Sequence, residues 1–202
     1  MYAIFKRSFD CISALLLLIV VSPLVFLLAL AVRVNLGSPI IFKQERTTKG
    51  KRRFNIYKFR TMTDKRNANG ELLPDKDRMT QFGSFLRSSS LDELPELVNI
   101  IKGDMAVIGP RPLPSVYDDY YFESELPRFD VRSGLVPPDS IDPNPIISWD
   151  KQFVYESEYG KSLSLAKDLK IILGVFRILF KRKKEDYGGF VRKSLSVERA
   201  KY

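Results

Sequence analysis

Two adjacent carboxylates, Asp92 and Glu93, follow three serines in the segment SSSLDELPEL, and they are the first residues that could do chemistry. Ser90 and Glu93 have the spacing of a capping box, in which serine and glutamate side chains bond backbone N–H groups at a helix start. Under that interpretation the two acids only begin a helix, whose dipole they complement. Catalysis is the alternative, because adjacent helical residues point in different directions and can hold two different partners.

Several cations near this pair in the sequence favour a phosphate ligand. Arg87 lies one turn upstream, and Arg111 follows in IGPRP, where two prolines stiffen the chain and Gly109 permits a tight backbone. Lys58 and Arg60 lie on an expected strand. A fixed guanidinium is suited to bidentate recognition of phosphate. Carboxylates among cations fit phosphoryl transfer, through an aspartyl-phosphate or a bound Mg²⁺.

The composition removes other chemistries. The chain has 202 residues, no His and one Cys, Cys11. Histidine bases, Ser-His triads, imidazole metal sites, thiolate zinc sites and internal disulfides are therefore excluded. The formal net charge of +9 indicates an anionic partner such as phosphate or lipid head groups. Nucleic acid is not expected, since no recognition motif is present.

A charge-free apolar segment runs from Cys11 to Val32. A helix of this length is about 33 Å long, which is close to the thickness of a bilayer core. Pro23 lacks an N–H, so the carbonyl of Ile19 loses its helical partner and the helix should kink, while Ser22 could bond a freed group. The segment is therefore expected to enter the membrane, with Ser22 and Pro23 as the break.

A single-span anchor and a re-entrant hairpin are both compatible with this segment. Basic residues favour the cytoplasmic side, and here they flank both ends of the segment. They are Lys6 and Arg7 before it, and Arg33, Lys43, Arg46, Lys49, Lys51, Arg52 and Arg53 after it. This two-sided charge favours re-entry.

The remainder predicts a mixed, mainly helical domain. Residues 40–42 and 54–59 read as two strands joined by a turn, and residues 80–88 as a helix. Residues 163–180 form a further helix with an apolar face at helical spacing. That face comprises Leu165, Leu169, Ile172, Phe176 and Leu179. It is either core or, with the following KRKK at 181–184, an interfacial surface against anionic lipid.

The chain resembles the bacterial sugar transferases, the small monotopic phosphoglycosyl transferases. The matching segments are KRSFDCISALLLLIVVSPLVFLLALAVRV, PIIFKQER, FNIYKFRTM, DRMTQFGSFLRSSSLDELPELVNIIKGDMAVIGPRPL and the later ISWDKQFVYE and SLSLAKDLKII. The resemblance implies transfer of a phospho-sugar from a UDP-sugar to a polyprenyl phosphate such as undecaprenyl phosphate, with release of UMP. It also implies the first membrane step of bacterial polysaccharide or glycoprotein assembly.

The resemblance assigns roles to individual residues. Asp92 would be the nucleophile that forms a covalent phospho-sugar intermediate and the residue near which Mg²⁺ is held. Glu93 would assist in proton handling or metal positioning. Arg87 and Arg111 match arginines near the phosphates, Lys58 matches the family's YKFR, and Arg60 adds a further cation.

The resemblance also implies an architecture: an α+β, mainly α fold with a re-entrant N-terminal helix, a small β-hairpin and interfacial helices in one compact membrane-associated domain. We expect a membrane segment at 1–36, a catalytic domain at 37–184 and a tail at 185–202. The active site would face the cytoplasm at the bacterial inner membrane, in contact with phospholipid. Downstream glycosyltransferases are possible partners, and the sequence leaves the oligomeric state, the sugar and the pathway open.

Two departures from the family pattern bear on these expectations. Ser133 replaces a proline, and the stretch Val131–Trp149 lacks the family's usual Gln and Arg, which puts recognition of nucleotide or sugar by this loop in question. Glu96 stands where Gln is common. A non-catalytic, membrane-anchored binding module is therefore the competing hypothesis.

Overall fold

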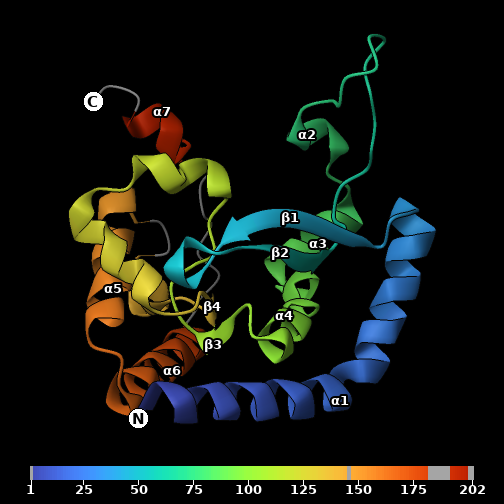
Figure 1. The fold of residues 1–202 in the computed structure, drawn as a ribbon. Helices are drawn as coiled ribbons and strands as arrows, with labels where there is room; N and C mark the ends of the chain where they lie inside the picture. Colours follow the sequence, from blue (N-terminus) through green and yellow to red (C-terminus); the bar gives the residue numbers. More distant parts are fainter. Residues whose placement is uncertain (1, 145–146, 182–191, 200–202) are drawn as a thin grey trace.

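Helices dominate the computed structural model, which describes residues 2–144, 147–181 and 192–199 (Figure 1). The helices are α1 (Tyr2–Leu36), α2 (Asp75–Arg78), α3 (Gln81–Ser88), α4 (Glu96–Lys102), α5 (Trp149–Lys161), α6 (Leu165–Lys181) and α7 (Leu195–Arg199). The strands are β1 (Ile41–Thr47), β2 (Arg53–Phe59), β3 (Ala106–Ile108) and β4 (Gly134–Val136). Short 3₁₀ turns connect them at Lys49–Lys51, Leu91–Glu93, Ser115–Tyr120, Glu123–Asp130 and Pro138–Ile141. The prediction of a mainly helical fold with a small sheet is confirmed.

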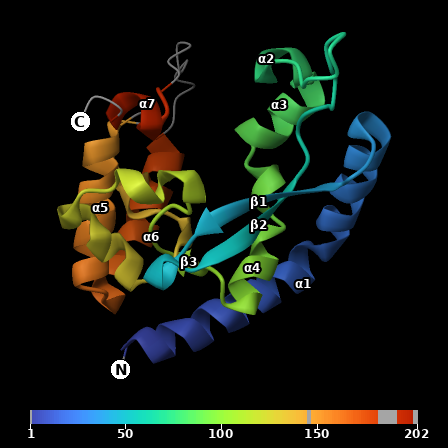
Figure 2. The same ribbon diagram turned by 45° about the horizontal axis from the view of Figure 1, so that its top comes forward.

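The two sheets join two groups of helices. β1 and β2 form an antiparallel hairpin, and β3 pairs with β4 in parallel. Figure 2 shows α5, α6 and α7 on one side of the hairpin and α2, α3 and α4 on the other. The hairpin predicted from the two apolar runs is present, and its first strand is longer than the sequence suggested. The hairpin therefore connects both helical groups.

The N-terminal helix α1 bends but does not break. It is continuous over 35 residues with Pro23 inside it, and it runs along the foot of the molecule before turning upward (Figure 1). The Ser22 hydroxyl donates to the Ile19 carbonyl at 2.8 Å, so the acceptor orphaned by Pro23 is satisfied locally. The expected helix-break-helix is thus a bent helix, because this hydrogen bond lets the chain continue through the proline.

Both arms of α1 pack against the same domain. In the first arm, Arg7 donates to the backbone oxygens of Ile100 and Ile101 at 2.6 and 2.8 Å, which caps the end of α4. Ala14 is buried in a cluster with β2 and α4. In the second arm, Val32 is buried in a cluster with β2 and α3. The domain therefore lies in the concave side of the bend.

The convex side of α1 is an exposed apolar surface. Its most apolar 18 residues have a mean hydropathy of 3.1, and only 11% of them are buried. Among the described residues, α1 is the one helix long and apolar enough to cross a membrane. Exposed apolar surface of this extent is typical of contact with lipid. α1 is therefore the membrane-associated part of the chain.

The core interpretation of the apolar face on α6 is wrong for three of its residues. Leu165, Leu169 and Phe176 are about half exposed, whereas Ile171 is buried against β3 and α5. The helix turns a different face to the core because Asp168 is also buried, where it accepts hydrogen bonds from Tyr2 and Tyr159 of neighbouring helices. The exposed face fits the interfacial alternative. The Leu179 side chain and residues 182–184 of the basic run lie outside the described residues.

Part of the expected C-terminal tail is an ordered helix. Leu195 of α7 is buried with Trp149 and Phe153, and Arg199 pairs with Glu125 at 2.6 Å. Residues 182–191 and 200–202 lie outside the described residues. The division into segments at 36 and 184 stays a prediction, but residues 195–199 pack against the domain.

Candidate active site

The adjacent carboxylates lie in a sharp turn between α3 and α4. Ser90 adopts a left-handed conformation with φ 56°, which costs an L-residue roughly 1–2 kcal/mol. A single 3₁₀ turn over Leu91–Glu93 follows it. Leu91 and Leu94 anchor this turn against the cluster of α1, β2 and α3. The acidic residues are therefore left to line the cavity beside the turn.

The capping-box interpretation is wrong. The Ser90 side chain makes no capping hydrogen bond, and its left-handed backbone differs from the extended conformation usual at an N-cap. The Glu93 carboxylate instead accepts a hydrogen bond from Lys58 Nζ at 2.7 Å. Glu93 is thus turned toward the hairpin rather than toward its own helix start.

Lys58 is held by two acids, and we call Lys58, Glu93 and Glu96 the Lys58 cluster. Lys58 Nζ lies 2.7 Å from Glu93 Oε1 and 3.1 Å from Glu96 Oε1. Burial lowers the pKa of Lys58, but the two carboxylates outweigh it, so that pKa is raised. Burial raises the pKa of Glu96 to about 7 despite the nearby Lys58 ammonium. The sequence did not assign Glu96 to the site, although its i, i+3 spacing from Glu93 was a signal.

Asp92 differs from these two acids because Lys58 does not bind it. Asp92 is 7% exposed and lines a cavity of about 700 Å³. Within the described part of the chain, no Lys or Arg comes within ion-pair distance of its carboxylate, whereas Glu93 and Glu96 share Lys58. Burial raises the pKa of Asp92, and Glu93 adds to this, while Lys58 and Arg87 act in the opposite direction. This carboxylate is therefore available to a ligand.

α3 carries Arg87 to the same cavity. Arg87 Nε donates to the Thr61 hydroxyl at 3.0 Å, and the side chain is exposed. One turn earlier, Gly83 touches the backbone of Thr61 so closely that a Cβ there would lie 1.8 Å from the Thr61 oxygen. Only a glycine allows α3 to approach this far, and the approach places Arg87 over the cavity.

Arg60 lines the cavity, but its guanidinium is used by the chain itself. It donates to the backbone oxygens of Met62 and Ser38 at 2.8 and 2.6 Å, and it pairs with Asp64 at 2.6 Å. These contacts fix the segment after β2. The prediction that Arg60 binds phosphate stays a prediction, and its contacts assign it a positioning role.

Arg111 projects from a rigid support. Its backbone N–H donates to Glu156 at 2.9 Å, and its carbonyl accepts from Arg128 at 2.7 Å. Gly109 is required here, since a Cβ would lie 2.2 Å from the Arg132 carbonyl oxygen. The Arg111 side chain is exposed and lines a small cavity of about 90 Å³ next to the large one.

The two cavities share the wall formed by Arg46, Lys58 and Glu93. The structure thus brings Asp92, Glu93, Lys58, Arg60 and Arg87 to one cavity and Arg111 to its neighbour. Arg46 was missed by the sequence reasoning. Its buried Nε has no hydrogen-bond partner in the described structure, and burial lowers the pKa of its guanidinium. The signal was the alternation in IFKQER, which puts Phe42, Gln44 and Arg46 on one face of β1.

The large cavity has a volume of about 700 Å³, in the range of small-molecule sites. Its charged lining comprises five cations and four acids, namely Arg46, Lys58, Arg60, Arg78, Arg87, Asp64, Asp75, Asp92 and Glu93. A lining of this kind suits an anionic ligand next to a carboxylate nucleophile.

Asp92 also fits a magnesium ligand. Within the described residues, no three His, Cys, Asp or Glu side chains are grouped as an all-protein metal site. Mg²⁺ is usually bound through one or two carboxylates plus substrate phosphates and water, so a single carboxylate free of ion pairs, at a cavity with room for a phosphate-bearing ligand, is suitable. The residues present therefore fit this ion, and Asp92 is the side chain that would hold it.

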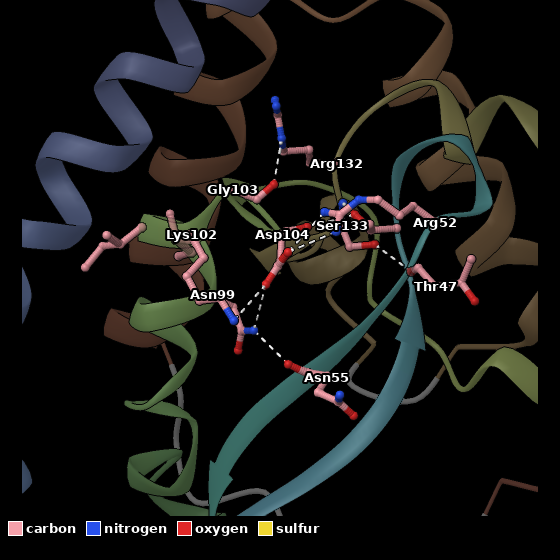
Figure 3. Close-up of polar contacts among 12 residues, drawn as sticks. Thr47, Arg52, Asn55, Asn99, Lys102, Gly103, Asp104, Arg132 and Ser133 are labelled. Atoms are coloured by element: carbon pink, nitrogen blue, oxygen red, sulfur yellow. Dashed lines mark hydrogen bonds and ion pairs between the residues drawn. The ribbon is translucent and has the colours of Figure 1, made fainter.

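Ser133, which stands where the family usually has a proline, adds hydrogen bonds to the scaffold (Figure 3). Ser133 N–H donates to the Thr48 hydroxyl, and the Ser133 hydroxyl donates to the Thr47 carbonyl, both at 3.1 Å. A proline could make neither bond. Nearby, Asp104 accepts from Arg52 at 3.1 Å, so the hairpin turn is tied to the end of α4 and to β4.

These features place carboxylates and cations at one cavity of a domain that carries a long apolar helix, and the chain belongs to the bacterial sugar transferase family. The family model described as "Bacterial sugar transferase" matches residues 1–182. The uncharacterized sugar transferase EpsL of Bacillus subtilis is 41% identical over 169 residues, which are 84% of each chain.

Two further relatives are UDP-glucose:undecaprenyl-phosphate glucose-1-phosphate transferases. The one from Caulobacter vibrioides is 34% identical over 83% of this chain and 67% of its own length. The one from Klebsiella pneumoniae is 33% identical over 95% of this chain but only 41% of its own length. Membership in a family of undecaprenyl-phosphate sugar phosphotransferases identifies the chain as a transferase.

Proposed function

We propose that this chain transfers a phospho-sugar from a UDP-sugar to undecaprenyl phosphate, releasing UMP, through a covalent intermediate on Asp92. The reaction would begin assembly of a bacterial glycan on its lipid carrier. The observation that carries the proposal is a difference in ion pairing among three neighbouring acids. Lys58 binds Glu93 and Glu96, whereas Asp92 faces the cation-lined cavity without an ion pair of its own in the described structure.

In the first step, an Asp92 carboxylate oxygen attacks the sugar-bearing phosphorus of the donor. The new oxygen–phosphorus bond forms as the bridging bond to the UMP phosphate breaks, and UMP leaves with the electron pair. In the second step, a phosphate oxygen of undecaprenyl phosphate attacks the same phosphorus and displaces the Asp92 carboxylate. The products are UMP and undecaprenyl-diphosphate-sugar, and Asp92 is regenerated.

The cations around Asp92 hold the donor and offset the repulsion between an anionic nucleophile and an anionic diphosphate. Arg87 lies over the large cavity, and Arg111 on its rigid support reaches the neighbouring one. Planar guanidinium groups suit bidentate contact with phosphate oxygens. Mg²⁺ bound at Asp92 would neutralise charge on the diphosphate. Glu93, fixed by Lys58, would keep the turn and its charge in place.

We further propose that α1 is re-entrant and that the domain lies on the cytoplasmic face of the inner membrane. A straight 35-residue helix would be about 50 Å long and would carry its two ends far apart. Instead, both arms contact one domain, and basic residues flank both ends of the apolar segment. The exposed apolar face of α6 would rest in the lipid interface. An acceptor phosphate at the head groups is then reachable while its tail stays in lipid.

The activity is tested by incubating the membrane fraction with undecaprenyl phosphate and a panel of UDP-sugars, and by measuring UMP. We expect UMP release with one or a few sugars, dependent on acceptor for multiple turnovers and on Mg²⁺. Absence of UMP release with every sugar would reject the proposal and would favour the non-catalytic, membrane-anchored binding module.

The topology is tested separately by cysteine labelling. In a Cys11→Ser background, Tyr2→Cys places a thiol near the N-terminus. A membrane-impermeant maleimide added from the periplasmic side should not label it. Labelling comparable to that of a periplasmic control protein would show that the helix crosses completely.

A further inference from the structure

We propose that Glu96 is a positioning residue that shares Lys58 with Glu93. When the anionic donor binds, Glu96 takes up a proton and releases the Lys58 ammonium. The inference rests on the proposed function and extends it to a residue outside the predicted catalytic pair. Glu96 is 3% exposed, and its Oε1 lies 3.1 Å from Lys58 Nζ. Lys58 belongs to the wall that the two cavities share. It does not line the large cavity that holds Asp92, so its effect on the donor is exerted through Lys58.

The geometry gives Lys58 more negative charge than it can neutralise. Its single ammonium contacts Glu93 at 2.7 Å and Glu96 at 3.1 Å, so the Lys58 cluster carries a net charge of about −1 when both acids are ionised. A second negative charge next to the entering diphosphate opposes its binding. If Glu96 is neutral, Lys58 pairs with Glu93 alone and the cluster is neutral. Protonation of Glu96 therefore favours an anionic ligand.

The surroundings of Glu96 allow this change near neutral pH. The groups that face it are Lys58 and Arg46 from the hairpin, Glu93 from the preceding turn and Arg111 from the segment after β3. Burial is the largest influence and raises the pKa of Glu96 to about 7, with Glu93 adding and Lys58 and Arg111 opposing. A donor phosphate close to Lys58 would compete with Glu96 for that ammonium, which raises the proton affinity of Glu96 further.

Linkage gives the expected pH dependence. A ligand that prefers the protonated form of a group binds more weakly as pH rises through the pKa of that group in the free protein. The KM for the UDP-sugar should therefore rise above pH 7, by up to about tenfold per pH unit for one linked proton. The diphosphate of a UDP-sugar is fully ionised in this range, so the ligand contributes no titration of its own.

The pH dependence of kcat distinguishes the ionisation of Asp92 from that of Glu96. The nucleophile must be ionised, so kcat should fall as pH falls, which is opposite in direction to the improvement in KM. In Glu96→Gln, the KM should stay low and independent of pH from 6 to 8.5, while the kcat profile keeps its shape. Glu96→Asp retains an acid, so the pH dependence of KM should return with a shifted midpoint.

The experiment measures KM and kcat for the UDP-sugar turned over by the full-length protein in lipid nanodiscs, at half-unit pH intervals. Glu45→Gln is the matched control: it makes the same change on β1, outside both cavities, and should behave as the wild type. Calorimetry of UDP-glucose binding at pH 8, in buffers of different ionisation enthalpy, is done with Asp92→Asn, which cannot form the covalent intermediate. It should show proton uptake in Asp92→Asn and none in the double variant Asp92→Asn, Glu96→Gln.

A KM that is independent of pH in the wild type, or a Glu96→Gln profile equal to that of the wild type, would overturn the role of Glu96. Either result would leave the proposed function standing, because turnover itself would have been measured. Failure of every UDP-sugar to release UMP would reject the proposed function instead. A thermal melt of each variant shows whether it is folded.

Discussion

Two charge clusters lie near the candidate cavity, and only one of them is complete. Arg128 and Glu156 pair at 2.8 Å with side chains 1% and 0% exposed, and Glu156 also accepts from Arg111 N–H. The Lys58 cluster has one cation for two acids, and Lys58 and Glu93 are partly exposed at the cavity wall while Glu96 is buried. The complete cluster supports the fold, whereas the incomplete one carries an excess negative charge that uptake of a proton by Glu96 would remove. Breaking each cluster should therefore have different consequences.

The largest effect is expected from Asp92→Asn. Asparagine has the same shape but cannot attack phosphorus, so turnover should fall by about 1,000-fold or more while the melting temperature stays near that of the wild type. UMP release and thermal unfolding are the measurements. Asp119→Asn, an exposed aspartate outside the cavity, is the control and should keep full activity. Unchanged turnover in Asp92→Asn would reject the mechanism.

Glu156→Gln should affect the fold instead of the chemistry. It leaves the buried Arg128 guanidinium without its charge partner, which typically costs about 3–5 kcal/mol. We expect a strongly lowered melting temperature and, in the fraction that remains folded, a higher KM, because the single amide oxygen of glutamine cannot serve both Arg128 Nε and Arg111 N–H. A melting temperature equal to that of the wild type would show that this cluster does not support the fold.

Glu96→Gln should stabilise the protein in a pH-dependent way. The pKa of Glu96 is raised in the folded state from 4.5 to about 7. The folded state therefore holds the proton more tightly than the unfolded one, and stability is lost as pH rises through this window. The variant should gain on the order of 2 kcal/mol at pH 8 and almost nothing near pH 4. Melting temperatures across pH 4–8 check this, and an equal shift at both ends would contradict it.

The smallest effect is expected from Arg111→Lys. Arginine 111 is tied to the fold by its backbone N–H and carbonyl, so the substitution should not change the melting temperature. A lysine cannot make the bidentate contact of a guanidinium, and the donor KM should rise by roughly tenfold. Arg53→Lys on the exposed face of β2 is the matched control. A lowered melting temperature in Arg111→Lys would contradict the claim that only the backbone of Arg111 supports the fold.

Local signals in the sequence predicted much of the fold. The apolar segment predicted α1, the two apolar runs predicted the hairpin, and the helix expected over residues 80–88 is α3. The structure adds that Thr80 caps α3, because its hydroxyl accepts from Gly83 N–H at 3.0 Å. The site residues Asp92, Glu93, Lys58 and Arg87 were also predicted, and the structure places them around one cavity. These predictions depend on short-range patterns or on a resemblance carried by contiguous motifs.

Contacts between distant segments could not be predicted in the same way. The left-handed Ser90 depends on how Leu91 and Leu94 pack against α1 and β2, so the capping box looked plausible from spacing alone. The core face of α6 is set by Asp168, whose partners lie on α1 and α5. Arg46 and Glu96 become neighbours of the site only because the hairpin and α4 meet at Lys58 in the folded chain.

The central claim is that Asp92 forms a bond to phosphorus, and intact-protein mass spectrometry tests it most directly. The purified protein is mixed with the UDP-sugar and Mg²⁺ without acceptor, quenched, weighed and digested. The account predicts a mass increase equal to one phospho-sugar, located on the peptide that contains Asp92, absent in Asp92→Asn and removed by undecaprenyl phosphate. A fully active protein that never gains this mass, or gains it at another residue, would contradict the account.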